Sequence, residues 1–239
     1  MVQPLILHIE TATDICSVAL SEGDQQLSLI ESGPERSHAT LLNSFIRKAF
    51  SESNKEMQQL DAIAVSKGPG SYTGLRIGVS TAKGISYALE RPLLSSGTLE
   101  IMAHGALTHS SVVELIGKYA NDLLLCPMLD ARRMEVYSSF YTTDLSVVRE
   151  VSADIIDEQS YRDLLNRKHI CFFGNGAAKC KDELAHPNSH FVFDIETSAR
   201  HMIVPAVERY KKELFEDVAY FEPFYLKDFV ATKPRKKVL

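Results

Sequence analysis

The 239-residue chain contains no tryptophan and only four cysteines. No two cysteines form a C-x-x-C pair, and Cys16, Cys126 and Cys171 stand in apolar, strand-like runs. This usage argues against a disulfide framework and predicts reduced thiols in a cytoplasmic protein.

The chain also lacks long apolar runs and an excess of positive charge. No run approaches the roughly 20 residues that cross a bilayer, and Met1-Val2-Gln3-Pro4 lacks the basic region of a signal peptide. The net charge of -5 and a pI of about 5.9 predict no global nucleic-acid-binding surface. With 45% hydrophobic and 24% charged residues, we expect a soluble globular protein without a membrane partner.

Three glycines within seven residues, Gly68, Gly70 and Gly74, follow the short β-type run 62–65 and precede a helical pattern. Strand, glycine loop and helix can aim backbone N–H groups at an anion. The loop has no Gly-Lys-Ser/Thr ending, its spacing is one residue too long for the dinucleotide fingerprint, and Pro69 removes a donor. These features argue against tight nucleotide binding by this loop alone. The loop stays a candidate site, and its residues are Gly68, Gly70, Ser71, Tyr72 and Thr73.

The helix after this loop carries a stripe of small residues. Gly74, Gly78 and Ala82 recur every four positions, although a glycine inside a helix costs roughly 1 kcal/mol relative to alanine. Small side chains let another backbone approach closely. The spacing leaves two alternatives open: packing on the protein's own sheet, or a surface that receives a partner's helix.

The order of expected elements occurs twice. Each half reads β-β-β-α-β-α-β-α and begins with a buried strand that ends at an acid, Glu10 or Asp130, 120 positions apart. Such a duplication is the plan of the two-lobed α/β fold of actin, Hsp70 and the sugar kinases, built from ribonuclease-H-like units. We expect an N-terminal lobe over 1–100, completed by about 205–239, and a second lobe over 101–204. The expected strands are 5–9, 15–20, 27–30, 62–66, 92–95, 123–129, 135–141, one near 147, 170–173 and 191–195; the expected helices are 37–50 with Ser37 as its cap, 76–89, 98–107, 157–166, one from 177, and 197–215.

In folds of this plan, the turns after the first strand of each lobe face one another and hold nucleotide phosphates. Here these turns are 10–13 and 130–133. The alternative is a cleft that has lost its ligand, because the fold alone does not decide function. The candidate residues of this vestigial cleft are Glu10, Thr11, Thr13, Asp130 and Arg132.

Several motifs resemble the TsaB (YeaZ) family, a glycoprotease-like family, from one end of the chain to the other. They are Ile6-Leu7-His8-Ile9-Glu10-Thr11-Ala12-Thr13, Arg36-Ser37-His38, the segment from Gly68 to Gly78, the segment from Asp130 to Tyr137, and Pro223-Phe224-Tyr225-Leu226.

The resemblance implies a non-catalytic subunit in tRNA processing. It would bind a TsaD-type transferase that, with a TsaE-type ATPase, moves threonylcarbamoyl from its adenylate to N6 of the adenosine beside the tRNA anticodon. It implies no cofactor for this chain, with ATP and a metal on partner subunits, a possible homodimer, and tRNA contact only within the complex. Family members pair through two helices that match 38–50 and 75–90 here, which favours the partner interpretation of the small-residue stripe. The implied interface residues are His38, Leu41, Leu42, Phe45, Gly74, Arg76, Gly78, Ala82 and Ile85.

Two enzymatic alternatives remain: an ATPase or small-molecule kinase of the same fold, and a metal-dependent glycoprotease. The transferase's His-x-x-x-His pair falls at Thr98 and Met102, neither of which is histidine. His186 and His190 have helical spacing, but Pro187 between them predicts a loop. The basic tail from Lys227 predicts at most a weak tRNA-backbone contact.

Overall fold

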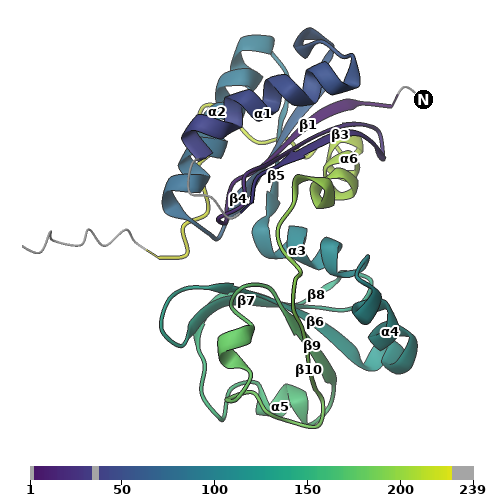
Figure 1. Cartoon of the computed structure of the whole chain (residues 1–239), viewed down its shortest axis with the longest axis vertical. Helices are drawn as coiled ribbons and strands as arrows, with labels where there is room; N and C mark the ends of the chain where they lie inside the picture. The colour runs from purple at the N-terminus through teal and green to yellow at the C-terminus, as the bar shows by residue number, and fades with distance from the viewer. Residues whose placement is uncertain (1–2, 34–37, 228–239) are drawn as a thin grey trace, which may run out of the picture.

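In the computed structural model, which describes residues 3–33 and 38–227, the chain forms two five-stranded sheets (Figure 1). The first sheet has the order β3-β2-β1-β4-β5, with β1 antiparallel to β2 and parallel to β4. Its strands are β1 (Leu5–Glu10), β2 (Ser17–Glu22), β3 (Gln25–Glu31), β4 (Ala62–Gly68) and β5 (Leu93–Gly97).

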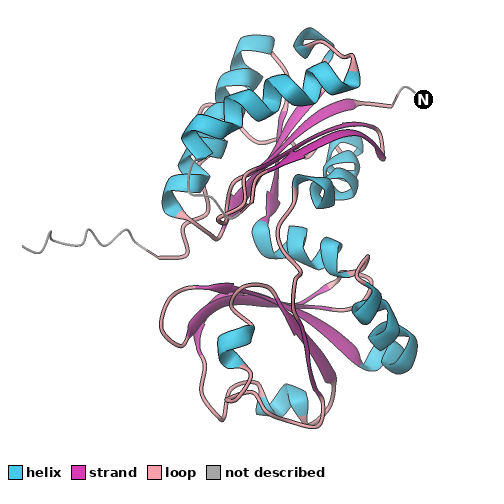
Figure 2. Cartoon of the chain, in the orientation of Figure 1, coloured by secondary structure: helices cyan, strands magenta, loops and turns pink. Residues whose placement is uncertain are grey.

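Helices cover both faces of this sheet, which is why β1 and β4 are continuous apolar runs. The helices α1 (His38–Ser53) and α2 (Tyr72–Leu89) pack on the face that carries Leu7 and Ile9. On the opposite face, Ile6 packs in a cluster with side chains of α3 (Thr98–Ala106) and α6 (Ile203–Lys211). Figure 2 shows these helices on either side of the first sheet.

The second sheet repeats this topology in the order β10-β9-β6-β7-β8. Its central strand β6 is antiparallel to β7 and parallel to β9, as β1 is to β2 and β4. The duplicated fold expected from the sequence is therefore confirmed. The strands are β6 (Leu123–Asp130), β7 (Glu135–Tyr141), β8 (Val147–Ile155), β9 (His169–Phe173) and β10 (Ser189–Val192).

Helix α3 lies between the two sheets (Figure 1). Its side chains Leu99 and Met102 belong to a core cluster of the second sheet, whereas Ile101 belongs to a cluster of the first. Because one helix serves both sheets, the lobe boundary at residue 100 stays a prediction.

The largest differences from the expected elements lie in the second half. The helix expected from Ala177 is only the 3-10 turn η3 (Ala178–Cys180), and the rest of the connection from β9 to β10 consists mostly of turns. The helix expected over 157–166 is reduced to α5 (Arg162–Leu165). The helix expected over 197–215 begins as the 3-10 turn η4 (Ala199–Met202) and continues as α6.

One helix has no counterpart in the expectation. Helix α4 (Ser110–Tyr119) buries Val112 and packs Leu115, Ile116 and Tyr119 against the second core. These positions follow helical spacing, so the signal was present in the sequence. Two further 3-10 turns complete the fold, η1 (Met57–Gln59) and η2 (Ala120–Asp122). The cap expected at Ser37 and the basic tail beyond 227 lie outside the described residues.

Candidate functional site

Glu10 ends β1 and is completely buried. Its Oε1 accepts hydrogen bonds from Ala12 N at 2.6 Å and Ser66 Oγ at 2.9 Å. Its Oε2 has no hydrogen-bond partner within residues 3–33 and 38–227. Burial raises the pKa of Glu10 to about 7, although the hydrogen bonds from Ala12, Ser66 and Thr11 lower it. One oxygen of this buried carboxyl group therefore supports the chain's own turn.

The rest of this turn binds three other segments. Thr11 Oγ1 donates to Gly74 O in α2 at 2.8 Å. The carbonyl of Thr13 is 2.7 Å from His38 Nε2 in α1, and its hydroxyl is 2.7 Å from Thr197 Oγ1. The turn consequently holds α1, α2 and the connection before η4 together.

The glycine loop packs against the same turn. Ser71 N donates to Ala12 O at 2.7 Å, and Ser71 Oγ caps α2 by accepting from Gly74 N at 3.3 Å. A Cβ on Gly70 would collide with the Ala12 carbonyl. The loop glycine is therefore needed because two backbones of this chain meet here.

The other end of the loop is covered by residues 216–227, which we name the C-terminal strap. Phe224 N donates to Lys67 O at 2.7 Å. Gly68 has a φ of +108°, and a Cβ there would lie 2.7 Å from Phe224 O. Tyr72 contacts Tyr225, with 4.9 Å between their ring centroids, whereas Thr73 is exposed. The motif around Phe224 was identified from the sequence. Its contact with the glycine loop was not predicted, because the two segments are far apart in the sequence.

The second turn is separate from the first. Asp130 is exposed at the end of β6, forms an ion pair with Lys179 and accepts from Arg132 N at 2.9 Å. Partial burial opposes the shift, but these hydrogen bonds hold the pKa of Asp130 below its usual value. Across the described ranges, no hydrogen bond or ion pair joins Asp130 or Arg132 to Glu10, Thr11 or Thr13. The structure thus bonds the first turn directly to the glycine loop, whereas the second turn bonds to Asn175 and Lys179 of its own lobe.

The small-residue stripe of α2 faces the protein's own first strand. Gly74, Gly78 and Ala82 are buried, and a Cβ on Gly78 would collide with Thr11 Oγ1. Gly74 and Gly78 therefore pack against the turn after β1, which favours the alternative of packing on the protein's own sheet. A partner contact by these two residues and Ala82 stays a prediction. Leu42 and His38 are buried as well.

The remaining interface candidates on the two helices are not fully buried, although Leu41, Phe45 and Ile85 pack partly against the first core. Leu41 and Phe45 on α1 are half-buried, as is Ile85 on α2, and Arg76 is exposed. A partner contact by α1 and α2 stays a prediction. The side chains that would make it are Leu41, Phe45, Arg76 and Ile85.

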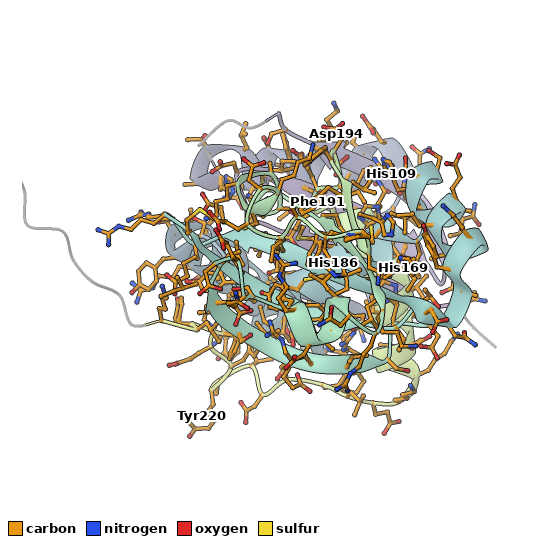
Figure 3. All side chains as sticks on the ribbon, turned by 90° about the horizontal axis from the view of Figure 1, so that it is seen from below. His109, His169, His186, Phe191, Asp194 and Tyr220 are labelled. Carbon is orange, nitrogen blue, oxygen red and sulfur yellow. The ribbon has the colours of Figure 1, made fainter. Side chains whose placement is uncertain are left out.

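The histidines form one close pair that spacing did not predict. His169 Nδ1 in β9 lies 3.1 Å from His190 Nε2 in β10, and Tyr119 stacks on His169 with 3.6 Å between ring centroids. His186 lies in the loop expected from Pro187, and its Nδ1 accepts from Asn188 N at 3.1 Å. Figure 3 labels His169 and His186 among the side chains of the molecule. Among the residues that the structure describes, no three or more His, Cys, Asp or Glu side chains are grouped to hold a metal ion.

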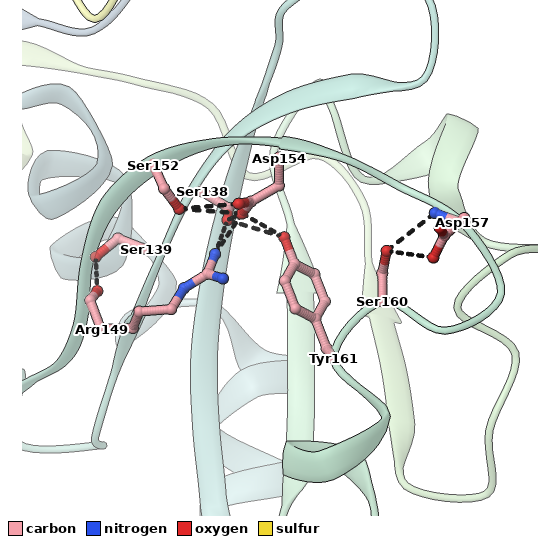
Figure 4. A network of polar contacts seen from close by, with 8 residues as sticks. All are labelled: Ser138, Ser139, Arg149, Ser152, Asp154, Asp157, Ser160 and Tyr161. Atoms are coloured by element: carbon pink, nitrogen blue, oxygen red, sulfur yellow. Dashed lines mark hydrogen bonds and ion pairs between the residues drawn. The ribbon is translucent and has the colours of Figure 1, made fainter.

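A second polar cluster lies between β7, β8 and α5 (Figure 4). Asp154 accepts from Tyr161 Oη at 2.7 Å and from Ser138, and it pairs with Arg149, whose guanidinium lies 4.7 Å from the centre of the Phe140 ring. Because its donors converge on one carboxylate, we interpret the cluster as a structural brace of the second lobe.

No helix in the described portion is both long and apolar enough to cross a membrane. All four cysteines are buried and unpaired.

Comparison with known proteins identifies the family. Residues 33–234 match the family model described as "TsaD: tRNA N6-adenosine threonylcarbamoyltransferase". The tRNA threonylcarbamoyladenosine biosynthesis protein TsaB of Escherichia coli is 32% identical over 139 residues, which cover 58% of this chain and 55% of that protein. The chain spans between 55% and 63% of the length of the first four curated relatives that it matches.

Two solved structures share the fold. One is an uncharacterized Pseudomonas aeruginosa protein with similarity to the peptidase YeaZ, with a TM-score of 0.80, 22% identity and coverage of 94% of this chain and 100% of that one. The other is YeaZ from Pseudomonas aeruginosa, with a TM-score of 0.75, 21% identity and coverage of 93% and 100%. The chain therefore belongs to the family that the TsaD model describes.

Proposed function

We propose that this chain is a non-catalytic, TsaB-type subunit of tRNA threonylcarbamoyladenosine synthesis. It binds a TsaD-type transferase and supports transfer of threonylcarbamoyl from its adenylate to N6 of the adenosine beside the tRNA anticodon. The names of the curated TsaB relatives support this assignment.

The burial of Glu10 is the observation that supports the proposal of a non-catalytic subunit. An acid that held a metal-bound nucleotide would need an oxygen facing the cleft. Here one carboxyl oxygen binds Ala12 and Ser66, and the whole side chain has no exposed surface. The glycine loop is likewise packed against Ala12 and Phe224. Nucleotide and metal chemistry then belong to the TsaD-type and TsaE-type partners.

The outer faces of α1 and α2 are the proposed partner surface. Leu41 and Phe45 on one helix and Ile77 and Ile85 on the other are apolar and half-buried in the isolated chain. Such residues gain most when a partner completes their burial. The same surface would serve a homodimer, which would compete with the transferase.

The acidic chain is proposed to meet tRNA only within the complex, because its net charge of -5 opposes binding to the phosphate backbone. We propose a cytoplasmic location, because the proposed role is in tRNA modification and because the four cysteines are unpaired.

Reconstitution with a cognate TsaD-type subunit, a TsaE-type ATPase, tRNA and threonylcarbamoyl adenylate tests the proposal. We expect tRNA modification to require this chain and to persist when it carries Glu10→Gln or Asp130→Asn. The isolated chain should not hydrolyse ATP. ATP hydrolysis by the isolated chain that either substitution abolishes would instead establish an enzyme.

A further inference from the structure

The C-terminal strap is bound to the first lobe along most of its length. Glu216 N donates to Leu93 O in β5 at 2.8 Å. Lys83 Nζ in α2 donates to the carbonyls of Ala219 at 3.2 Å and Phe221 at 2.8 Å. Because most of these bonds use the strap's backbone, they fix its path along α2 independently of its side chains.

An aromatic contact holds the strap at the N-terminal end of α2. The Arg76 guanidinium lies 4.3 Å from the centre of the Tyr72 ring, and Arg76 Nε donates to Tyr225 Oη at 3.4 Å. Tyr72 and Tyr225 contact each other directly. The strap therefore leaves the first lobe at a defined point, two residues before Lys227.

Lys227 then reaches the second lobe. Its ammonium group forms an ion pair with Glu135, the first residue of β7. The carbonyl of Glu135 accepts from Lys179 Nζ at 2.7 Å, and Lys179 also pairs with Asp130. The strap thus joins the glycine loop of one lobe to the second turn of the other.

The chain itself crosses between the sheets twice, where β5 enters α3 and where β10 leads to η4. Figure 1 shows both crossings near the middle of the molecule, with the yellow strap to their left. Two crossings define an axis about which the lobes can rotate, and a third contact away from that axis restrains the rotation. We propose that the strap is a latch between the lobes, in which the Lys227–Glu135 pair biases their relative orientation.

The strength of the latch is bounded by its exposure. The Lys227 and Glu135 side chains are 43% and 22% exposed, and exposed ion pairs shift an equilibrium by no more than about five-fold. The latch therefore biases the lobe orientation without locking it. Salt should weaken it, because the Debye length falls from about 10 Å at 0.1 M to about 3 Å at 1 M.

Distances between spin labels in the two lobes test the latch in the full chain. Cysteines introduced at the exposed positions Ser51 in α1 and Asp163 in α5 carry the labels, and the four native cysteines are buried. We expect Lys227→Glu to broaden the distance distribution and shift its mean, and Glu135→Lys to do the same. The charge-swapped double variant should return the wild-type distribution, and about 1 M salt should broaden the wild type towards the single variants.

Lys212→Glu is the matched control, because Lys212, which follows the last residue of α6, makes an exposed ion pair with Glu208 in that helix. The same charge change there should leave the distribution unaltered. Wild-type distances in Lys227→Glu, or a double variant that stays as broad as the single ones, would overturn the latch. A chain that ends after Glu222 loses Phe224, Tyr225 and Lys227 together, and wild-type distances in it would overturn the latch as well.

Discussion

The hydroxyl of Thr11 occupies the space beside Gly78 that any larger residue would need, and it donates to Gly74 O at 2.8 Å. Thr11, in the turn that follows β1, therefore explains two of the three glycines of α2: Gly74 and Gly78 let the helix lie directly on this turn.

Gly78→Leu should destabilise the isolated monomer. The new side chain collides with Thr11, and overpacking typically costs about 1–3 kcal/mol, more than the roughly 0.8 kcal/mol that leucine gains over glycine in a helix. Urea unfolding at a concentration that keeps the chain monomeric measures the change.

Gly84→Leu in the same helix is the control. Gly84 is exposed and a Cβ there meets nothing within 4 Å, so this variant should gain roughly 0.8 kcal/mol. Equal gains in both variants would mean that Gly78 faces open space.

The buried carboxyl of Glu10 predicts a loss of stability as the pH rises. Its pKa is about 7 in the folded chain against an ordinary value of 4.5, so between these values the folded state binds the extra proton. Stability from this group is then full below pH 4.5 and lost as the pH rises to 7, by on the order of 3 kcal/mol. Glu10→Gln should remove this slope from pH-dependent unfolding curves, and an identical slope in the variant would contradict the assignment.

His8 predicts the opposite slope on the acid side. It is completely buried, its Nε2 lies 2.9 Å from Ser21 Oγ, and burial lowers its pKa to about 3. The unfolded chain binds the proton first, so stability is full above pH 6.5 and falls by on the order of 5 kcal/mol towards pH 3. Subtracting the unfolding curves of His8→Gln from those of the wild type isolates this contribution; a difference that does not vary with pH would refute it.

The sequence predicted the fold well because its strongest signals are local. The duplicated topology could be predicted from two signals: the apolar runs that begin at Leu5 and Leu123, and the repeated order of elements. The helix expected from Ala177 was wrong: the connection from β9 to β10 holds only the 3-10 turn η3, and the local sequence pattern does not distinguish such a turn from a short helix.

The candidate site was predicted less completely, since its contacts join distant segments. The spacing of the glycines could not show whether Gly78 contacts Thr11 of this chain or a partner protein. Likewise, no residue near Gly68 in the sequence indicates that Phe224 is its neighbour. The burial of Glu10 likewise depends on Ser66, 56 positions away.

Co-elution with a cognate TsaD-type transferase tests the central claim of a partner surface on α1 and α2 most directly. Phe45→Asp and Ile85→Asp place charges on the outer faces of the two helices, while Ile155→Asp changes a 76% exposed apolar residue on β8 of the second sheet. Size-exclusion chromatography of mixtures with equal amounts of transferase should show the complex for the wild type and Ile155→Asp, and its loss for the other two variants, with all three variants folded by circular dichroism. Retention of the complex by both Phe45→Asp and Ile85→Asp would contradict the account.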